Sequence, residues 1–276
     1  MDFIYNIPRQ VIYALVAAAV FTPILLKMEA DVIPAPESKA VYEYVDKLTE
    51  GSVVLFAQDY DPSSEPELTP MTMAFLRHCF KKKLKVISVN VFSVAGVGLG
   101  QLAFKQMEEE FGVKSGTDYV YLGFRPGLAN SIRAVNAGIV NYFVTDANLV
   151  ETSSMPIFEK VKSGKDIDFL LTVAAGATPE AWRLFGASES GYPMAAGCTA
   201  VSFASYFPFY QSGQFTGILG GLKGAADYEQ MVGVPGIARK GMVSQSFVHI
   251  LLIVLIVLGN FAFVHERAAR RSGGAI

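Results

Sequence analysis

Residues 53–91 read VVLFAQDYDPSSEPELTPMTMAFLRHCFKKKLKVISVNV, and this stretch decides the fold class. Its ends, Val53–Ala57 and Lys85–Val91, are short apolar runs with the length of buried strands. Between them, a polar loop with proline leads into a helix expected from Thr69 to Lys82. Strand, helix and strand in this order predict a parallel βαβ unit, in which helices cover the sheet.

The same alternation continues along the chain. Further strands are expected at Tyr119–Gly123 and Phe169–Ala174, with a weaker one at Ile139–Val144. Helices are expected at residues 38–49, 98–111, 130–137 and 179–185. This order predicts one α/β domain, residues 38–243, with a doubly wound, mostly parallel Rossmann- or flavodoxin-like sheet.

Two apolar stretches flank this domain. The chain is 51% hydrophobic and only 17% charged, and the apolar excess lies at its two ends. Residues 247–264, FVHILLIVLIVLGNFAFV, are expected to form a transmembrane helix. Residues 11–27 are expected to form a second, shorter one, for which a cleaved signal peptide is the alternative. A linker, residues 28–37, leads from this first helix into the domain.

Basic residues predict the orientation in the membrane. The amino-terminal tail, residues 1–10, and the carboxyl-terminal tail, residues 265–276, carry arginines at positions 9, 267, 270 and 271. By the positive-inside rule both tails are expected in the cytoplasm and the domain outside it, although Arg239 and Lys240 argue the other way. His249 and Asn260 are expected near the headgroups. A formal net charge of −2 gives no reason to expect nucleic acid as a partner.

Asp59 and Asp61 follow the first predicted strand. Two carboxylates at this spacing are able to hold a divalent metal ion or to supply a nucleophile and an acid. The alternative is that Asp61-Pro62-Ser63 forms a turn at the start of a solvated acidic loop. The metal site and the turn both remain open at this point.

Gly96, Gly98 and Gly100 lie where a predicted strand gives way to a helix. Backbone amides at such a helix start are able to bind a phosphate, so these glycines form a candidate nucleotide site. Their spacing departs from the Gly-x-Gly-x-x-Gly pattern, and a close helix–strand packing turn is the alternative. The sequence names no cofactor.

Gly213, Gly217, Gly220 and Gly224 recur at steps of four, three and four. If the segment is helical, these glycines share one face, where another backbone is able to approach closely. We expect this face to pack either within the domain or against another subunit. The aromatic run before it, residues 206–210, is expected at a membrane interface or in a partner's groove.

The sequence assigns no catalytic residues. His78 is the only histidine of the central domain, and no Gly-x-Ser-x-Gly elbow occurs. Cys79 and Cys198 fit neither a zinc site nor a redox motif, and their pairing is left open. We therefore expect a membrane-anchored, non-catalytic interaction or assembly protein that binds a protein partner or a second copy, such as an accessory subunit of a larger complex. The alternative is a membrane-tethered enzyme or ligand sensor that uses the loops at the strand ends.

Overall fold

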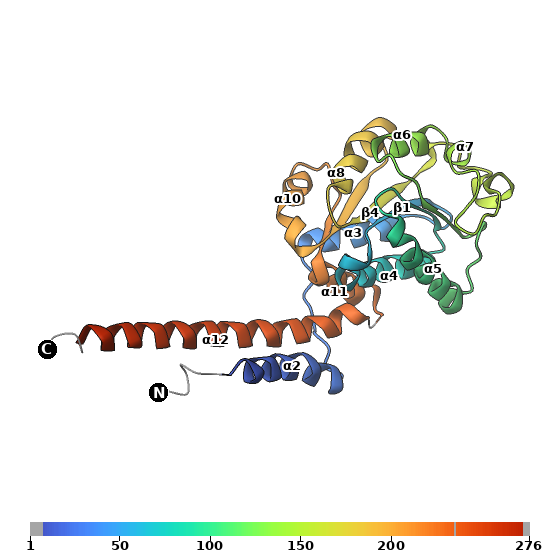
Figure 1. The fold of residues 1–276 in the computed structure, drawn as a ribbon. Coiled ribbons are helices and arrows are strands. Elements are labelled where there is room, and N and C mark those ends of the chain that lie inside the picture. The colour runs from blue at the N-terminus through green and yellow to red at the C-terminus, as the bar shows by residue number, and fades with distance from the viewer. Residues whose placement is uncertain (1–7, 235, 273–276) are drawn as a thin grey trace. The chain divides into compact units, whose positions relative to one another are not determined.

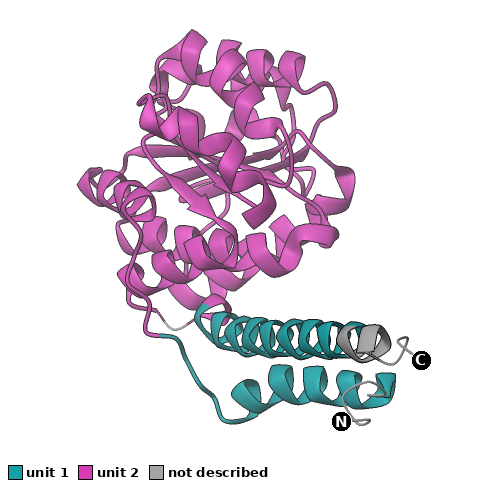
Figure 2. Cartoon of the chain, turned by 90° about the vertical axis from the view of Figure 1, so that its left-hand side faces the viewer, with its two compact units in different colours: residues 1–30, 239–276 teal, residues 31–238 magenta. Residues whose placement is uncertain are grey.

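The computed structural model describes residues 8–234 and 236–272 of the 276-residue chain. It divides into two compact units, which Figure 2 colours separately. One is an α/β domain, Asp31–Ala238, and the other is a helical unit formed by residues 1–30 and 239–276.

Six parallel strands form the sheet of the α/β domain (Figure 1). The strands are β1 (Val53–Asp59), β2 (Lys85–Asn90), β3 (Tyr119–Phe124), β4 (Phe169–Ala174), β5 (Met194–Cys198) and β6 (Ile218–Gly220). Their order is β3-β2-β1-β4-β5-β6, so the direction of winding reverses between β1 and β4. The predicted parallel α/β sheet is confirmed.

Helices cover both faces of this sheet (Figure 1). One face carries α3 (Pro36–Lys47), α4 (Glu65–Lys81), α5 (Val97–Phe111) and α11 (Gly221–Val232). The other carries α6 (Ala129–Ala137), α7 (Ile139–Tyr142), α8 (Thr178–Trp182) and α10 (Ala200–Gln211). All six residues of β4 are buried, as expected for a strand covered on both sides.

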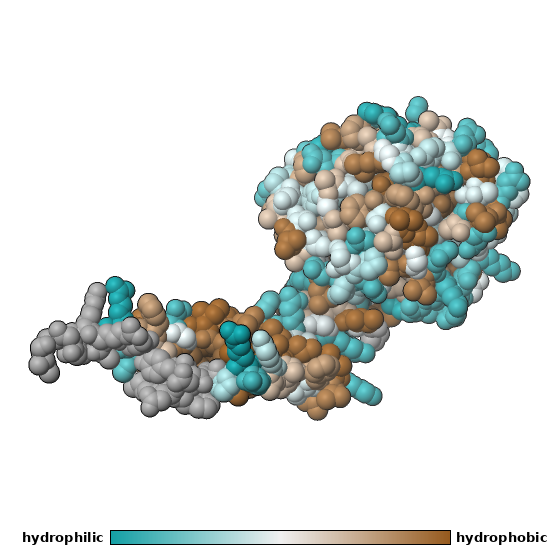
Figure 3. Space-filling view, viewed as in Figure 1, coloured by the Kyte–Doolittle hydropathy of each residue, from teal (hydrophilic) through white to brown (hydrophobic). Residues whose placement is uncertain are grey.

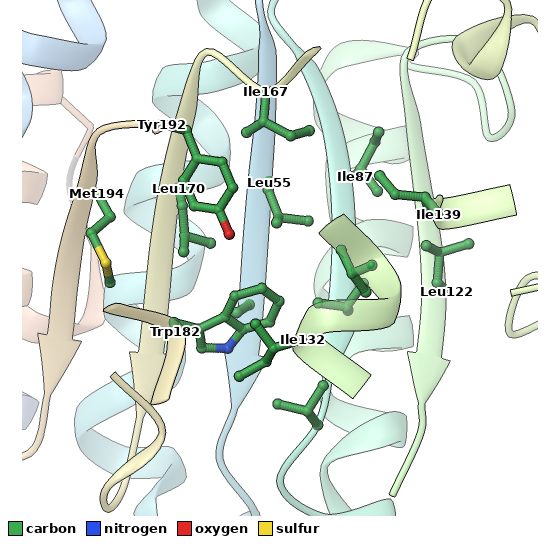
Figure 4. Close-up of a cluster of buried hydrophobic side chains, with 14 of the residues drawn as sticks. Leu55, Ile87, Leu122, Ile132, Ile139, Ile167, Leu170, Trp182, Tyr192 and Met194 are labelled. Atoms are coloured by element: carbon green, nitrogen blue, oxygen red, sulfur yellow. The ribbon is translucent and has the colours of Figure 1, made fainter. Parts of the chain in front are cut away.

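The core therefore has two layers. On the first face the rings of Phe56 in β1 and Phe75 in α4 lie 5.5 Å apart. On the second face the indole of Trp182 packs near Leu55 of β1 and Ile132 of α6 (Figure 4). The side chains of the apolar runs that predicted the strands point alternately into these two layers.

One predicted strand is wrong, and two strands were not predicted. Residues Ile139–Val144 do not form a strand, because Ile139–Tyr142 is the short helix α7. Only Gly138 separates α7 from α6, so no connection is long enough to return this run to the sheet. The small residues of β5, MAAGC, and the three residues of β6 lack the β-branched runs by which strands are recognised.

The glycines at 213, 217, 220 and 224 do not line one helix, so that expectation is wrong. Gly213 and Gly217 lie in the loop after α10, Gly220 ends β6, and Gly224 lies in α11. Gly213 has φ +74° and Gly221 has φ +55°, values that a right-handed helix does not adopt. A Cβ atom at Gly217 would lie 2.5 Å from the Glu37 carbonyl oxygen, so this glycine permits close packing inside the domain. The subunit contact predicted for these glycines stays a prediction.

Helix α11 holds both ends of the domain chain. Asp227, fully buried in α11, accepts the Ala35 N–H at 3.1 Å and pairs with Lys223. Glu229, also buried, accepts the Ala238 N–H at 3.1 Å. The segment entering the domain and the segment leaving it are therefore fixed to one helix by charge-assisted hydrogen bonds.

Replacing Asp227 with alanine is expected to loosen the entering segment. A hydrogen bond to a charged group contributes roughly 1.5–3 kcal/mol, so the Ala35 amide of Asp227→Ala is expected to exchange with deuterium about tenfold faster or more. The matched control is Glu43→Ala, which removes only an exposed pair with Lys39. Equal Ala35 exchange rates in wild type and Asp227→Ala would contradict this role.

The helical unit contains α2 (Arg9–Leu25) and α12 (Ile237–Ser272) from Arg239 onward. The two helices run side by side in opposite directions (Figures 1 and 2). Ser244 Oγ donates to the Val20 carbonyl at 3.1 Å. Residues at steps of three and four are less exposed than their neighbours, the pattern of a helix–helix seam: Ile12, Val16, Ala19 and Pro23 in α2, and Ser244, Val248, Leu251 and Leu255 in α12.

One helix of the described chain is long and apolar enough to cross a membrane. It is Ile237–His265, which includes the predicted segment 247–264. Helix α2 has 17 residues and falls short of this length, so the predicted pair of transmembrane helices is not confirmed. Of the predicted tails, residues 1–7 and 273–276 lie outside the described residues.

Candidate functional site at the switch point

The gap between β1 and β4 is where doubly wound domains bind ligands, outside the carboxyl ends of the strands. Asp59 is the last residue of β1 and pairs in register with Ala174, the last residue of β4. One of the two predicted metal ligands therefore lies at the switch point of the sheet.

The carboxyl group of Asp59 is fully buried and bound on both oxygens. Oδ1 accepts the Val91 N–H at 2.8 Å, just past β2, and Oδ2 accepts the Trp182 indole N–H at 2.7 Å. Trp182 has no exposed surface and belongs to α8, the helix that follows β4. One side chain thus joins β1, the loop after β2 and a helix on the other side of the switch point.

Burial and hydrogen bonding act on Asp59 in opposite directions. Burial raises the pKa of the carboxyl to about 7, while the hydrogen bonds from Val91 and Trp182 lower it. Burial is the larger effect. Asp59 therefore changes its charge near neutral pH, as carboxyl groups with perturbed pKa values at functional sites do.

Asp61 has a different environment. Its Oδ1 accepts the Ser63 N–H at 3.0 Å and the Ser63 hydroxyl at 2.5 Å, capping the turn Pro62–Ser64. This is the turn that the sequence offered as the alternative to a metal site. No group of three metal-binding side chains occurs in the part of the chain that the structure describes. The assignment of a metal to Asp59 and Asp61 stays a prediction.

The three glycines after β2 have unequal surroundings. A Cβ atom at Gly96 would lie 2.1 Å from the Tyr60 carbonyl oxygen, and one at Gly100 would lie 2.4 Å from the Tyr121 ring. Nothing lies within 4 Å of the same position at Gly98. Close packing therefore accounts for Gly96 and Gly100, as the alternative reading of the sequence proposed. Nucleotide binding here stays a prediction.

Sequence reasoning missed two aromatic residues that form hydrogen bonds at the switch point, Trp182 and Tyr206. Trp182 is the only tryptophan of the chain, which is a signal that was available. The Tyr206 hydroxyl of α10 donates to the Gly176 carbonyl in the loop after β4. Gln58 precedes Asp59 in β1, and its side chain is fully buried with neither polar atom hydrogen-bonded within the described part of the chain.

Two cavities of the domain lie away from the switch point. One of about 480 Å³ lies at the opposite edge, around the start of β2, where Lys83 and Lys85 pair with Glu50 and Asp118 at 3.2 and 2.9 Å. Another, of about 220 Å³, lies between α10 and α11 beside Phe203. The second cavity is smaller than the roughly 300–1,000 Å³ of typical small-molecule pockets.

The histidine and the cysteines of the domain are buried in its core. Burial lowers the pKa of His78 to about 4, and its Nδ1 lies 2.9 Å from the Tyr228 hydroxyl. Cys79 and Cys198 are both free thiols, and burial raises the pKa of Cys198 to about 12. Buried neutral thiols of this kind are poor nucleophiles.

The chain matches no family model, no curated protein and no solved structure. The fold and the site define its class as a parallel α/β domain with six strands, in which a buried tryptophan binds the carboxyl group at the switch point; its described residues include one helix long and apolar enough to span a membrane.

Trp182 fluorescence is expected to titrate with Asp59. Because Trp182 is the only tryptophan and donates to Asp59, its emission in the folded full-length protein should change with a midpoint near pH 7. The Asp59→Asn variant should show no such transition. A midpoint that persists in Asp59→Asn would contradict this assignment.

The same ionisation is expected to affect stability. The folded pKa of Asp59 lies above the unfolded value of 3.8, so its contribution to the unfolding free energy falls as the pH rises from about 4 to about 7. The difference in unfolding free energy between wild type and Asp59→Asn should change by about 4 kcal/mol at most between these two pH values. Denaturant titrations at several pH values measure it, and a difference independent of pH would contradict it.

The glycines of the α5 start provide a matched pair. Gly100→Ala is expected to destabilise the protein by about 1–3 kcal/mol, because the new methyl group overlaps the Tyr121 ring. Gly98→Ala has open space and removes a glycine from a helix, so it should be neutral or stabilising by up to about 1 kcal/mol. Thermal unfolding distinguishes them, and equal effects would show that packing does not explain these glycines.

Proposed function

We propose that this protein is a membrane-anchored, non-catalytic interaction or assembly protein, such as an accessory subunit of a larger membrane complex. The observation that carries the non-catalytic part is the closed switch point. At the position where doubly wound domains bind ligands, the Trp182 indole covers the Asp59 carboxyl and both carboxyl oxygens are hydrogen-bonded.

The surface of α12 supports the membrane anchor. Apolar side chains gather on the visible surface of the helical unit (Figure 3). Ten large apolar residues between Phe247 and Val264 are exposed. Burying such a side chain is worth about 1.5–3 kcal/mol, so leaving these ten in water would cost on the order of 10 kcal/mol, comparable with the stability of a whole domain. A bilayer removes this cost.

The orientation follows from the arginines and from the helix pair. In this proposal both tails are cytoplasmic, and the α/β domain lies outside the cytoplasm. The antiparallel course of α2 and α12 supports tails on one side, because the start of α2 and the end of α12 point in the same direction (Figure 1). With α2 in the bilayer beside α12, the protein has two anchors.

The exposed side of α10 supports an interaction role for the domain. This helix carries no charged residue, and only Tyr206 among its side chains is fully buried. Val201 on its outer side is 89% exposed. Uncharged, partly aromatic surface of this kind is typical of contact sites with proteins or with membrane interfaces.

A ligand sensor or enzyme is the second candidate, and Asp59 is the observation that favours it. A buried carboxyl with a pKa raised to about 7 at the carboxyl edge of the sheet is a feature of many active sites. In that case Asp59, with Asp61 or with the loop Gly96–Gly100, would bind a divalent metal or a nucleotide.

Thermal unfolding in the presence of ligands separates the two candidates. We expect the melting temperature of the full-length protein in detergent to be unaffected by Mg²⁺ and by a panel of nucleotides, in wild type and in Asp59→Asn/Asp61→Asn alike. A ligand-induced rise of several degrees in wild type that the double variant lacks would support the sensor or enzyme and contradict our proposal.

Cysteine labelling tests the orientation. Val201→Cys is expected to react with a membrane-impermeant maleimide in intact cells, and Gly273→Cys only after the membrane is permeabilised. Wild type gives the background, because Cys79 and Cys198 are buried. The reverse labelling pattern would place the domain in the cytoplasm.

A further inference from the structure

The helical unit is closed by polar contacts at the end where the chain leaves α2 and returns into α12. The Ala30 N–H donates to the Arg239 carbonyl at 3.2 Å, and Arg239 Nε donates to the Ala30 carbonyl at 3.0 Å. The two carboxylate oxygens of Glu29 lie 3.8 Å from Arg239 Nη1 and from Lys240 Nζ. We call these four residues, Glu29, Ala30, Arg239 and Lys240, the clasp.

The end of α2 directs the chain into the clasp. The Lys27 N–H donates to the Ile24 carbonyl at 3.1 Å, and the Met28 N–H donates to the Pro23 carbonyl at 2.9 Å. These are the two hydrogen bonds of a Schellman cap. Lys27 has φ +51° at the position that glycine usually occupies in such caps, a conformation unfavourable for a residue with a side chain. Such a conformation persists only where surrounding contacts hold it, and the clasp follows directly.

A hydrogen bond between the helices continues the closure beyond the clasp. Ser244 is 8% exposed, and its Oγ donates to the Val20 carbonyl of α2 at 3.1 Å. Ser246, two residues further along α12, instead donates to the Met242 carbonyl of its own helix. Serine hydroxyls that reach a neighbouring helix contribute to helix pairing in membranes. Ser244 therefore lies on the side of α12 that contacts α2.

We propose that the clasp makes α2 a permanent partner of α12, so that the first apolar stretch is a structural helix of the mature protein and not a removable signal peptide. Susceptibility of a segment to cleavage depends on the burial and hydrogen bonding of its backbone, and both backbone groups of Ala30 are bonded to Arg239. Residues 28–30, Met-Glu-Ala, also lack the small-x-small pattern of a cleavage site. The inference rests on the proposed membrane anchoring and adds what holds the second helix.

The clasp also accounts for the two cations that argue against the predicted orientation. Arg239 and Lys240 both lie against the carboxylate of Glu29, and the side chain of Arg239 is only 18% exposed. Their positions follow from the closing of the helix pair, on whichever side of the membrane the clasp lies. In this proposal they are structural residues of the helical unit.

Cysteine cross-linking in membranes tests the helix pair. Val16 and Val248 lie one turn beyond Val20 and Ser244, respectively, away from the clasp. In the full-length chain, Val16→Cys/Val248→Cys is expected to give a disulfide-linked peptide pair on oxidation, detected by mass spectrometry. Leu15→Cys/Val248→Cys is the matched control and should remain unlinked, because Leu15 is 43% exposed on another side of α2. Equal linking of both variants, or of neither, would overturn the inference.

Charge reversal tests the clasp itself. Glu29→Lys replaces two attractive pairs with two repulsive ones, so in lipid nanodiscs the Ala30 amide should exchange with deuterium roughly tenfold faster. Asp31→Lys makes the same charge change two residues further on, where the carboxylate is exposed and forms no ion pair within the described residues. It should leave the Ala30 exchange rate unchanged. Equal rates in the two variants would show that the Glu29 pairs do not hold the helices together.

Intact mass and alkaline extraction distinguish the two levels of failure. The chain purified from membranes is expected to retain residues 9–25 and to resist extraction. A chain that lacks these residues but resists extraction would overturn the clasp and leave the proposed anchoring by α12 intact. A full-length chain that forms the cross-link but is released by extraction would support the clasp and contradict the proposed function.

Discussion

The carboxyl group of Asp59 joins the parts of the α/β domain at its centre. It ends β1 beside β4, and its two oxygens bind the backbone after β2 and the indole of Trp182. A carboxyl buried this deeply is costly unless its oxygens are hydrogen-bonded, and these two donors meet that requirement. The two halves of the doubly wound sheet are thereby held together at the point where such folds otherwise bind a ligand.

A second set of buried charges ties the domain to its flanking segments. Asp227 and Glu229 of α11 hold the backbone of Ala35 and Ala238 respectively. The chain enters and leaves the domain through these two contacts, and α12 continues directly from the second.

The sequence was sufficient for the parts of the fold that depend on local pattern. The first four strands and the helices α3, α4 and α5 were predicted because their apolar residues recur at regular spacing, whereas α10 and α11 were not among the predicted helices. Strand β5 was missed because its sequence, MAAGC, has no β-branched side chain. The glycines from Gly213 to Gly224 have the spacing of one helical face, but a loop and a strand separate them. The contact of Trp182 with Asp59 joins residues 123 positions apart, and no local pattern predicts which strand end a distant helix will cover.

The central claim is that α12 lies in a bilayer, since the proposed anchoring and orientation both depend on it. Hydrogen–deuterium exchange of the full-length protein in lipid nanodiscs tests it most directly. Anchoring predicts one continuous block of amides from Phe247 to Val264 that does not exchange over hours, flanked by faster exchange near Lys240 and Arg267. Exchange of this block at the rate of the exposed helices of the α/β domain would contradict it.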